Sequence, residues 1–395
     1  MRVAVIAEYY PRRRDPAKGA WAHRQALAAR DAGADPTVLA LERPLPGAAA
    51  LRDAARGRPG PAARELRAAA AQPRREAIDG VEVEYVRFVS PPRESSYAGW
   101  HRWAARPLAR ALDRLHARRP LDLVHAHYAL PAGGAAAPWA ERNGVPLVVS
   151  VHGGDLLSPL LAGPAARSTV AAVLATARVT VANSRGMLDR AAALAGGAGR
   201  MRVIHPPGEP PPEPPPPRRE QPTVATLGAV DPRKRHADVL AALTELPDVR
   251  WLVIGDGPEL PRLAAQAAEL GLSDRVEWTG ALPPREAVAQ LATCHALALP
   301  SVDEAFGVAY TEALACGLPA IGCAGEPGPE EIAALTEAML LVPPRDPRAL
   351  AETIRAALAQ RDELSRAARA AAEEHFSLEV CGRLTVEAYG EAIAG

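Results

Sequence analysis

Residues 299–319 read Leu299-Pro-Ser-Val-Asp-Glu304-Ala-Phe-Gly307-Val-Ala-Tyr-Thr-Glu312-Ala-Leu-Ala-Cys-Gly317-Leu-Pro319. The apolar residues that lead into Leu299 predict the end of a buried strand. Pro300 to Phe306 predict a loop, and Val308 to Cys316 predict a helix. Gly317 and Pro319 end that helix, because glycine suits a C-terminal cap and proline cannot continue a helix. The stretch therefore predicts a strand, a loop and a helix in succession.

Two carboxylates in this stretch have a spacing that suits a nucleotide. Nearly every residue of the predicted helix is small or apolar, so the helix should be buried on most sides and Glu312 needs a partner. At about 1.5 Å of rise per residue, Glu312 lies about 7 Å along the helix axis from Gly307. A nucleoside diphosphate spans that distance, with its phosphates at the helix start, its ribose at Glu312, and Glu304 facing what lies beyond the phosphates. In the alternative interpretation, both carboxylates are simply solvated.

The composition describes a globular protein of two domains. The chain has 395 residues, too many for one ordinary core, and 48% of them are hydrophobic. A formal net charge of zero argues against a dedicated nucleic-acid-binding protein. No apolar run is long enough to span a bilayer and no signal peptide precedes the first strand, so we expect a cytoplasmic protein.

The sequence shows no pattern typical of a metal site. It lacks an Asp-x-Asp triplet of the kind that holds a divalent cation against a diphosphate. The four cysteines lie in apolar surroundings without metal-like spacing, which predicts reduced, buried thiols (Cys294, Cys316, Cys323 and Cys381). We therefore expect no metal and no bound cofactor.

The first half of the chain alternates strands and helices. Arg2 to Ala7 predict a strand, and the following loop ends at Gly19. A glycine there either lets a ligand approach the backbone or makes an ordinary turn. A helix from Trp21 to Ala32 comes next. Further strands are predicted at Thr37–Leu41, Leu121–His127, Pro146–Val151, Arg178–Ala182 and Met201–His205.

Polar residues follow two neighbouring strands of this half. One strand ends in His125-Ala-His127-Tyr128, and the next ends in His152-Gly-Gly-Asp155. Ligands of open α/β sheets bind at the carboxyl ends of the strands. His152 is therefore a candidate site residue, although a structural histidine explains the local pattern equally well. We expect His125 and His127, which share one strand face, to support the site.

Three segments of the first half are less regular. Pro44 to Pro73 predict a partly helical surface excursion rich in arginine and proline. Val81 to Val89 alternate in the manner of a strand pair. Gly99 to Arg119 predict a helix interrupted near Pro107 that carries two tryptophans and many arginines. Such a helix either lies on an anionic membrane surface or packs its apolar stripe on a sheet.

A proline-rich run separates two sets of alternating strands and helices. Pro206 to Pro217 predict a semi-rigid linker. After it, Thr223 to Gly228 predict a strand that is followed by the basic loop Asp231 to His236. Two such sets predict an α/β protein with two Rossmann-like domains that face each other across a cleft. The predicted boundaries are 1–205 for the N-terminal domain, 206–222 for the linker, 223–375 for the C-terminal domain and 376–395 for a final helix.

These motifs resemble the retaining glycosyltransferases of family 4, which have the GT-B architecture and use nucleotide-sugar donors. The most specific likeness is Glu304-x7-Glu312 within Pro300 to Pro319. The other stretches that carry it are 122–127 through 150–153, 253–260, 274–280, 341–347 and 375–378. The likeness covers nearly the whole chain except Pro44 to Pro73. The loop from Lys18 to Arg24 is most similar to members that build bacterial cell-envelope glycans.

The resemblance implies roles for matching residues of the second half. Glu312 would hold the ribose hydroxyls, and Lys234 would neutralise the diphosphate. Glu304 would hold the donor sugar together with the backbone of Phe306, Gly307 and Val308. Arg275 and Val276 would flank the nucleotide base.

In the first half, the resemblance implies that Gly19 admits the diphosphate against the first loop. His152 would lie at the donor sugar, and Asp155 and Tyr128 would lie near the acceptor. The last helix would cross back onto the first domain.

The sequence departs from the family pattern at the phosphate site. An arginine that often accompanies the phosphate lysine is replaced by Ala229. Arg233 or Arg235 is a candidate replacement. Ala305 stands where glycine is usual, and Pro206 replaces a common asparagine.

The resemblance implies a metal-independent retaining transferase that moves a sugar from a nucleotide donor, with UDP or GDP as the expected nucleotide, to an acceptor hydroxyl. The acceptor stays open among a cell-envelope glycan, a lipid-linked molecule with peripheral membrane contact, and a secondary metabolite. Two alternatives are a nucleotide-sugar 2-epimerase on the same fold and a non-catalytic nucleotide-sugar binding protein, which the missing arginine would favour.

Overall fold

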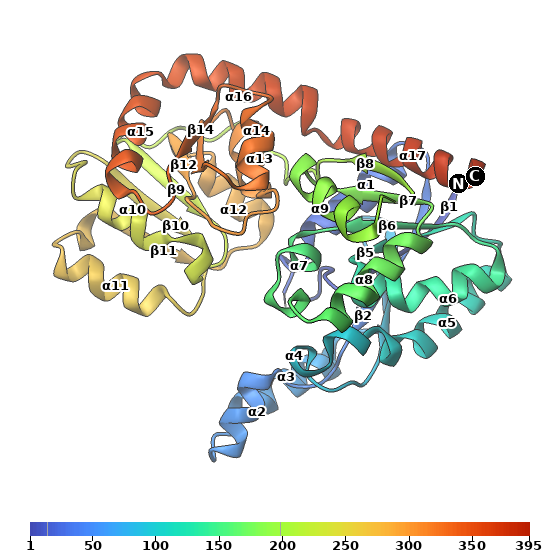
Figure 1. Ribbon diagram of the computed structural model, residues 1–395. Coiled ribbons are helices and arrows are strands. Elements are labelled where there is room, and N and C mark those ends of the chain that lie inside the picture. Colours follow the sequence, from blue (N-terminus) through green and yellow to red (C-terminus); the bar gives the residue numbers. More distant parts are fainter. Residues whose placement is uncertain (14, 198) are drawn as a thin grey trace. The chain divides into compact units, whose positions relative to one another are not determined.

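The computed structural model describes residues 1–13, 15–197 and 199–395, which form two compact units (Figure 1). The first unit comprises Met1–Ile204 together with Cys381–Gly395. The second comprises His205–Val380. Each unit combines a largely parallel sheet with helices and is described separately.

The first unit contains the following elements. Its strands are β1 (Arg2–Ala7), β2 (Asp35–Glu42), β3 (Arg75–Ile78), β4 (Val81–Arg87), β5 (Leu123–His127), β6 (Leu147–Val151), β7 (Val179–Ala182) and β8 (Arg200–Val203). Its helices are α1 (Ala20–Asp31), α2 (Ala48–Ala55), α3 (Gly60–Ala71), α4 (Arg93–Ser96), α5 (His101–Arg118), α6 (Gly134–Asn143), α7 (Gly153–Leu156), α8 (Pro164–Thr176), α9 (Arg185–Ala195) and α17 (Leu378–Ala394).

The sheet of the first unit has the order β3-β4-β2-β1-β5-β6-β7-β8 across the part of the chain that the structure describes. All neighbours are parallel except β3 and β4. The central strands are apolar on both faces because helices cover both faces of such sheets, and Val3, Ile6 and Val149 are fully buried. The strand order reverses between β1 and β5. Ligands of such sheets bind at the carboxyl edge beside this reversal.

Two sequence-based expectations for this unit are wrong. The segment from Val81 to Val89 contains one strand, β4 (Val81–Arg87), and not a pair, because β4 takes its antiparallel partner from the preceding segment, Arg75–Ile78. The helix α5 also continues through Pro107 without a break. The arginine-rich excursion contains α2 and α3, and α2 projects away from the sheet at the lower edge of Figure 1.

The second unit contains six strands and seven α-helices within its described residues. Its strands are β9 (Thr223–Leu227), β10 (Arg250–Ile254), β11 (Val276–Gly280), β12 (Ala296–Ala298), β13 (Ala320–Cys323) and β14 (Met339–Val342). Its helices are α10 (His236–Leu243), α11 (Leu260–Glu269), α12 (Pro284–Leu291), α13 (Val308–Ala315), α14 (Pro327–Ala333), α15 (Pro347–Ala359) and α16 (Arg361–His375).

The six strands of the second unit are parallel and have the order β11-β10-β9-β12-β13-β14. This is the Rossmann order, with its reversal between β9 and β12. A hydrophobic cluster on one face of the sheet includes Phe306, Tyr310 and Leu314, which anchor α13 and the loop before it. The loops that follow β9 and β12 therefore meet on a rigid support.

From Cys381 on, the last helix belongs to the first unit, as the family resemblance implies. A Cβ atom on Gly382 would lie 2.2 Å from the carbonyl oxygen of Ala28, so only glycine allows α17 to pack this closely on α1. Farther along α17, the hydroxyl of Tyr389 lies 2.8 Å from Nδ1 of His125 on β5. The buried polar contact and the close backbone approach both fix the position of α17.

Candidate active site

Lys234 and Glu304 form an ion pair at the strand-order reversal of the second unit. Lys234 follows β9 and Glu304 follows β12, and Nζ of the lysine donates to Oε2 of the glutamate at 2.5 Å. Both side chains are largely buried, with 15% and 12% exposed. Arg235 and Asp303, the neighbours of the pair, have the positive φ angles 52° and 54°. Such strained backbone is typical of functional sites, where the surrounding structure holds it in place.

The backbone of Glu304 is held by a glycine-rich loop that follows β13. Oε2 of Glu326 accepts the N–H of Glu304 at 2.8 Å. The N–H of Gly328 donates to the carbonyl of Glu304 at 3.1 Å. A Cβ on Gly328 would lie 2.2 Å from the carbonyl oxygen of Phe306. Glu326 therefore positions Glu304, a role that the sequence analysis did not assign. The glycines on either side of it, Gly325 and Gly328, are the sequence feature that could have indicated this loop.

Gly307 begins the helix α13 with a φ of 84°. A Cβ at this position would lie 2.4 Å from the ring of Tyr310, so glycine is required both for the backbone conformation and for space. The first N–H groups of α13, including that of Val308, lack partners within the helix and suit an anion. The Phe306 side chain is buried in the core, and only its backbone is available to a ligand.

Glu312 lies in the second turn of α13 and is half-buried. Its Oε1 accepts the N–H of Glu209 at 3.0 Å. A Cβ on Gly208 would lie 2.5 Å from Cγ of Glu312, so a glycine in the linker makes this approach possible. The partner that the sequence analysis required for Glu312 is a backbone amide of the proline-rich segment.

The candidate replacements for the missing arginine are already paired. Ala229 is exposed in the loop after β9. Arg235 makes a two-point contact with Asp238, at 2.6 and 2.8 Å. Arg233 pairs with Asp231 at 3.2 Å and is half-exposed. Lys234 is the cation of this loop that reaches Glu304.

Arg275 and Val276 lie at the opposite edge of the sheet from this pair. They mark the amino end of β11, whereas the loops of Lys234 and Glu304 follow the carboxyl ends of their strands. The guanidinium of Arg275 donates to the backbone carbonyls of Leu243, Leu246, Pro247 and Val249 at 2.5–3.2 Å. The structure therefore does not bring these two residues together with Lys234 and Glu304.

In the first unit, Gly19 caps α1 with a φ of 67°. A Cβ at this position would lie 2.2 Å from the carbonyl carbon and oxygen of Tyr9. Only glycine therefore lets the start of α1 rest against the loop that follows β1.

Three histidines form a buried row at the carboxyl ends of β5 and β6. Nε2 of His125 lies 2.7 Å from Oγ of Ser150. Nδ1 of His127 lies 3.3 Å from Nε2 of His152. Burial lowers the pKa of His125 and of His152 to about 3, and lowers that of His127 well below its ordinary value. All three rings are therefore neutral near pH 7, and His152 lies beside Trp21 at a centroid distance of 4.1 Å.

Asp155 is fully buried beneath this row. Its two oxygens accept the backbone N–H groups of Ala129 and His152, both at 2.9 Å. Burial raises the pKa of Asp155 to about 7, against the lowering effect of these hydrogen bonds. The carboxyl group is turned into the protein, where it orders two loops.

Tyr128 is strained and surrounded by rings. Its φ is 77°, which is unusual for a residue with a side chain. A Cβ on Gly154 would lie 2.9 Å from Cε1 of Tyr128, so the missing side chain makes room for the ring. The rings of Tyr9, His152 and Trp21 lie 5.2, 4.9 and 6.1 Å from that of Tyr128. An aromatic surface therefore lies beside the strand-order reversal of the first unit.

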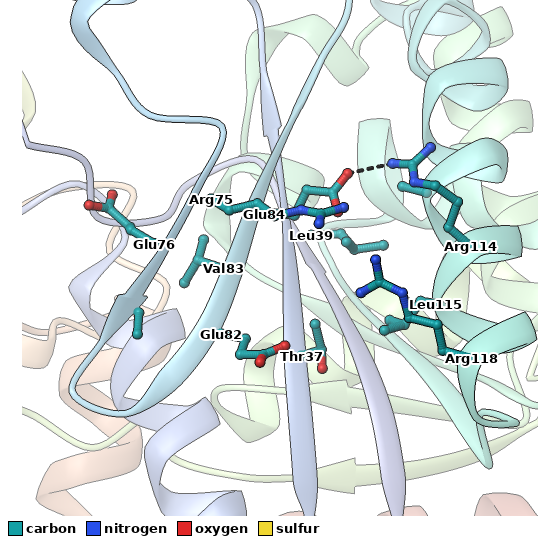
Figure 2. A pocket seen from close by; sticks show the side chains of 12 residues that line it. Thr37, Leu39, Arg75, Glu76, Glu82, Val83, Glu84, Arg114, Leu115 and Arg118 are labelled. Atoms are coloured by element: carbon teal, nitrogen blue, oxygen red, sulfur yellow. Dashed lines mark hydrogen bonds and ion pairs between the residues drawn. The ribbon is translucent and has the colours of Figure 1, made fainter.

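A separate cavity of about 310 Å³ lies between α5 and the strands β2 to β4 (Figure 2). Leu39 and Leu115 line it together with three arginines. Glu84 holds Arg75 at 2.7 Å and Arg114 at 2.5 Å. Because Glu84 pairs with two of these arginines and the cavity lies away from the carboxyl ends of the strands, we assign no role to this cavity. Within the described residues, no cluster of three or more His, Cys, Asp or Glu side chains has a geometry that could hold a metal ion.

Two family models match the chain along most of its length. The model for Glycosyltransferase Family 4 matches residues 19–207, and that for Glycosyl transferases group 1 matches residues 212–375. The chain belongs to glycosyltransferase family 4. The two matched ranges fall on the two units of this family 4 protein.

Among characterised relatives, D-inositol 3-phosphate glycosyltransferase of Mycobacteroides abscessus is 30% identical over 243 residues. That match covers 54% of this chain and 53% of the relative. GDP-mannose-dependent alpha-(1-6)-phosphatidylinositol monomannoside mannosyltransferase of Mycolicibacterium smegmatis is 28% identical over 249 residues, or 57% of this chain and 64% of the relative. The matches thus span between about half and two thirds of these relatives.

Solved structures share the GT-B fold of this family 4 protein. Sucrose-phosphate synthase from Thermosynechococcus elongatus aligns over 100% of this chain and 99% of its own, with a TM-score of 0.74 and 20% identity. Anabaena HepE in complex with UDP aligns over 99% and 100%, with a TM-score of 0.69 and 18% identity. None of the helices in the described ranges is both long and apolar enough to cross a membrane.

Proposed function

We propose that this protein transfers a sugar from a nucleoside diphosphate donor to an acceptor hydroxyl with retention of anomeric configuration. The observation that carries the proposal is the Lys234–Glu304 pair at the carboxyl edge of the second unit, beside the N-terminus of α13. A cation and free N–H groups at a helix start bind the diphosphate of such a donor. A carboxylate accepts hydrogen bonds from hydroxyl groups of its sugar.

In the proposed complex, the diphosphate binds Lys234 and the N–H groups of Gly307 and Val308. The ribose hydroxyls bind Glu312, which lies one turn along the same helix and already accepts one N–H group. Once Lys234 contacts phosphate, Glu304 accepts hydroxyl groups of the donor sugar. HepE of the same fold, which was solved with UDP, makes a uridine nucleotide the first donor to test.

The proposed reaction breaks the bond between the anomeric carbon and the β-phosphate oxygen, and that oxygen keeps the electron pair. The acceptor oxygen forms the new bond to the anomeric carbon from the same face, and its proton passes to the leaving phosphate. Lys234 and the start of α13 stabilise the charge that develops on the diphosphate. The protein residues supply binding and electrostatic stabilisation, and the proposal needs neither a covalent intermediate on the enzyme nor a metal.

We further propose roles for four residues of the first unit. His152 is neutral and is proposed to donate or accept one hydrogen bond with a sugar hydroxyl. Gly19 is proposed as a phosphate-binding residue because its lack of a side chain lets the start of α1 rest against the backbone of Tyr9. Asp155 holds the backbone of His152, and the ring of Tyr128 faces the acceptor. Arg275 supports β11 from its amino end, so base contacts are assigned to the other end of that strand.

The acceptor is a glycan, a lipid-linked molecule or a soluble metabolite. The two relatives described above act, by their names, on an inositol phosphate and on a phosphatidylinositol mannoside. The arginine-rich α2–α3 excursion, with Leu51 and Leu66 exposed, suits contact with an anionic membrane surface.

The experiment is a thermal-shift screen of UDP-, GDP- and ADP-sugars, followed by NMR analysis of the anomeric configuration of the product. One nucleotide should stabilise the protein, and product should form in the presence of a chelator. In Glu312→Ala the stabilisation should disappear, whereas Glu337→Ala, a change on the same unit away from the site, should behave as wild type. Equal stabilisation of wild type and Glu312→Ala would overturn the assignment of the ribose site.

A further inference from the structure

The loop after β1 places an ion pair beside the aromatic surface of the first unit. Glu8 and Tyr9 directly follow β1, at the strand-order reversal. Nη1 of Arg93, from α4, donates to Tyr9 at 2.9 Å and to Glu8 at 3.4 Å. The two charged side chains are only 17% and 13% exposed. This pair lies where ligands of such sheets bind, and the reaction proposed above does not use it.

Arg93 is rigidly held. Its guanidinium lies over the rings of Tyr97 and Trp100, at 5.2 and 5.4 Å from their centroids. Trp100 is itself fixed by a hydrogen bond of 2.7 Å from Nε1 to Oγ of Ser90. A guanidinium that is already ordered loses little entropy when it binds a further group.

The hydrogen bonds of Arg93 are incomplete. A guanidinium carries five N–H donors. Here Nη1 is shared between two acceptors, and the buried Nε meets no acceptor among the residues that the structure describes. Buried donors normally have hydrogen-bond partners. A buried donor that lacks one is a candidate for a hydrogen bond to a ligand.

Basic side chains from two segments of the first unit act on Glu8. Burial raises the pKa of its carboxyl, while Arg93, Lys18 and Arg12 lower it. Three cations therefore act on one carboxylate. Nζ of Lys18 lies 5.1 Å from the centroid of the Tyr9 ring, on the same loop.

We propose that Arg93 recognises an anionic group on the acceptor, a phosphate or a carboxylate, and that Glu8 occupies this position until the acceptor displaces it. Phosphate and carboxylate oxygens match the guanidinium fork in the same way. The acceptor ring then lies on Tyr9 and Tyr128. This inference rests on the proposed function, because it assigns the acceptor of that reaction.

The test measures binding of D-glucose, D-glucuronate and D-glucose 6-phosphate to the full chain saturated with UDP, by calorimetry. The wild type should bind at least one of the two anions about tenfold or more tightly than glucose. Arg93→Gln should remove the preference, and Arg106→Gln, which changes an exposed arginine of α5, should keep it. Binding of UDP is read separately, so its failure would count against the donor site and not against this inference.

Glu8→Gln should change the affinity for the anion in the direction opposite to Arg93→Gln. It therefore distinguishes an arginine that binds the anion from one that only supports the fold. If Glu8 competes with the acceptor, this variant should bind the preferred anion about threefold to tenfold more tightly. If the Glu8–Arg93 pair is only structural, Glu8→Gln should bind the anion more weakly or with unchanged affinity, and either result overturns the proposal. Equal binding of glucose and both anions to the wild type also overturns it. Flotation with phosphatidylinositol or phosphatidylcholine vesicles shows whether the anionic group belongs to a lipid or to a soluble acceptor. Arg93-dependent capture by the former assigns a lipid headgroup, and its absence, with anion binding, assigns a soluble acceptor.

Discussion

The ammonium group of Lys234 lies 2.5 Å from a carboxylate oxygen of Glu304, although 70 positions separate the two residues in the chain. The contact exists because β9 and β12 are neighbours at the reversal of the strand order. The cation proposed for the diphosphate and the carboxylate proposed for the sugar therefore neutralise each other in this structure. Donor binding must exchange this contact for two new ones.

Lys234→Ala should weaken UDP binding by roughly tenfold to a hundredfold, because it removes a phosphate contact and leaves the Glu304 charge uncompensated beside the anion. Calorimetric titration with UDP measures the loss. Arg233→Ala is the matched control on the same loop, since Arg233 pairs with Asp231 and should leave the affinity within about twofold. A loss of equal size in the two variants would contradict the assignment.

Ala229→Arg should tighten UDP binding by about threefold to tenfold, because position 229 is exposed in the loop after β9 and its family counterpart is often an arginine. The gain should shrink as salt is added, since an exposed charge is screened. Titrations at low and high ionic strength measure both effects. Ala229→Gln, a long neutral side chain, should show no gain. An unchanged affinity in Ala229→Arg at low salt would mean that the diphosphate does not pass this position.

Asp155 should make the first unit less stable as pH rises. Its pKa is about 7 in the folded protein and about 3.9 in an unfolded chain, so the folded state binds the proton more tightly. The stabilisation is complete below about pH 4 and is lost as pH rises toward 7, by at most about 1.4 kcal/mol per pH unit.

Asp155→Asn removes this titration, so the deficit of the variant against wild type should become smaller between pH 5 and pH 7. Urea unfolding followed by circular dichroism at several pH values measures the difference between the two proteins. A deficit that grows with pH over this range would show that the ionised carboxylate is the stabilising form.

Tyr389→Phe should lower the free energy of unfolding by about 1–2 kcal/mol, because Nδ1 of His125 is then buried without its hydrogen-bond partner. Chemical denaturation measures the change. In a double-mutant cycle, Tyr389→Phe should cost less in a His125→Phe background than in wild type, because the loss of the Ser150 partner is common to both variants that carry His125→Phe. An equal cost in the two backgrounds would place the contribution of Tyr389 in packing alone.

Much of the secondary structure could be predicted from the sequence because its causes are local. The strand β1 begins and ends at the predicted residues, and α13 begins at the predicted residue and ends one residue earlier than predicted. The errors came from non-local causes. The partner of β4 is the preceding strand β3, and α5 keeps its helical path through Pro107 where the helix packs on the sheet. Alternation shows that a strand is half-buried, but it does not identify the neighbouring strand.

For the candidate site, residue types and spacing on one element were sufficient to propose Gly307 and Glu312, since Gly307 precedes α13 and Glu312 lies in its second turn. Residue types and spacing could not show where Arg275 and Val276 lie, because the direction of β11 within the sheet decides which edge these residues occupy. They also missed Glu326 and Arg93, whose partners Glu304 and Glu8 are distant in the chain.

The sequence by itself determined the alternation of strands and helices and the glycines that allow close approach, because hydrophobic period and backbone freedom are properties of short segments. Only the tertiary structure decided which charged groups meet. The Lys234–Glu304 pair, the amide that Glu312 accepts and the burial of Asp155 all depend on strand order and on loops that converge from distant positions. The free energy of a charged group depends on what surrounds it, and its surroundings in this protein come from the fold.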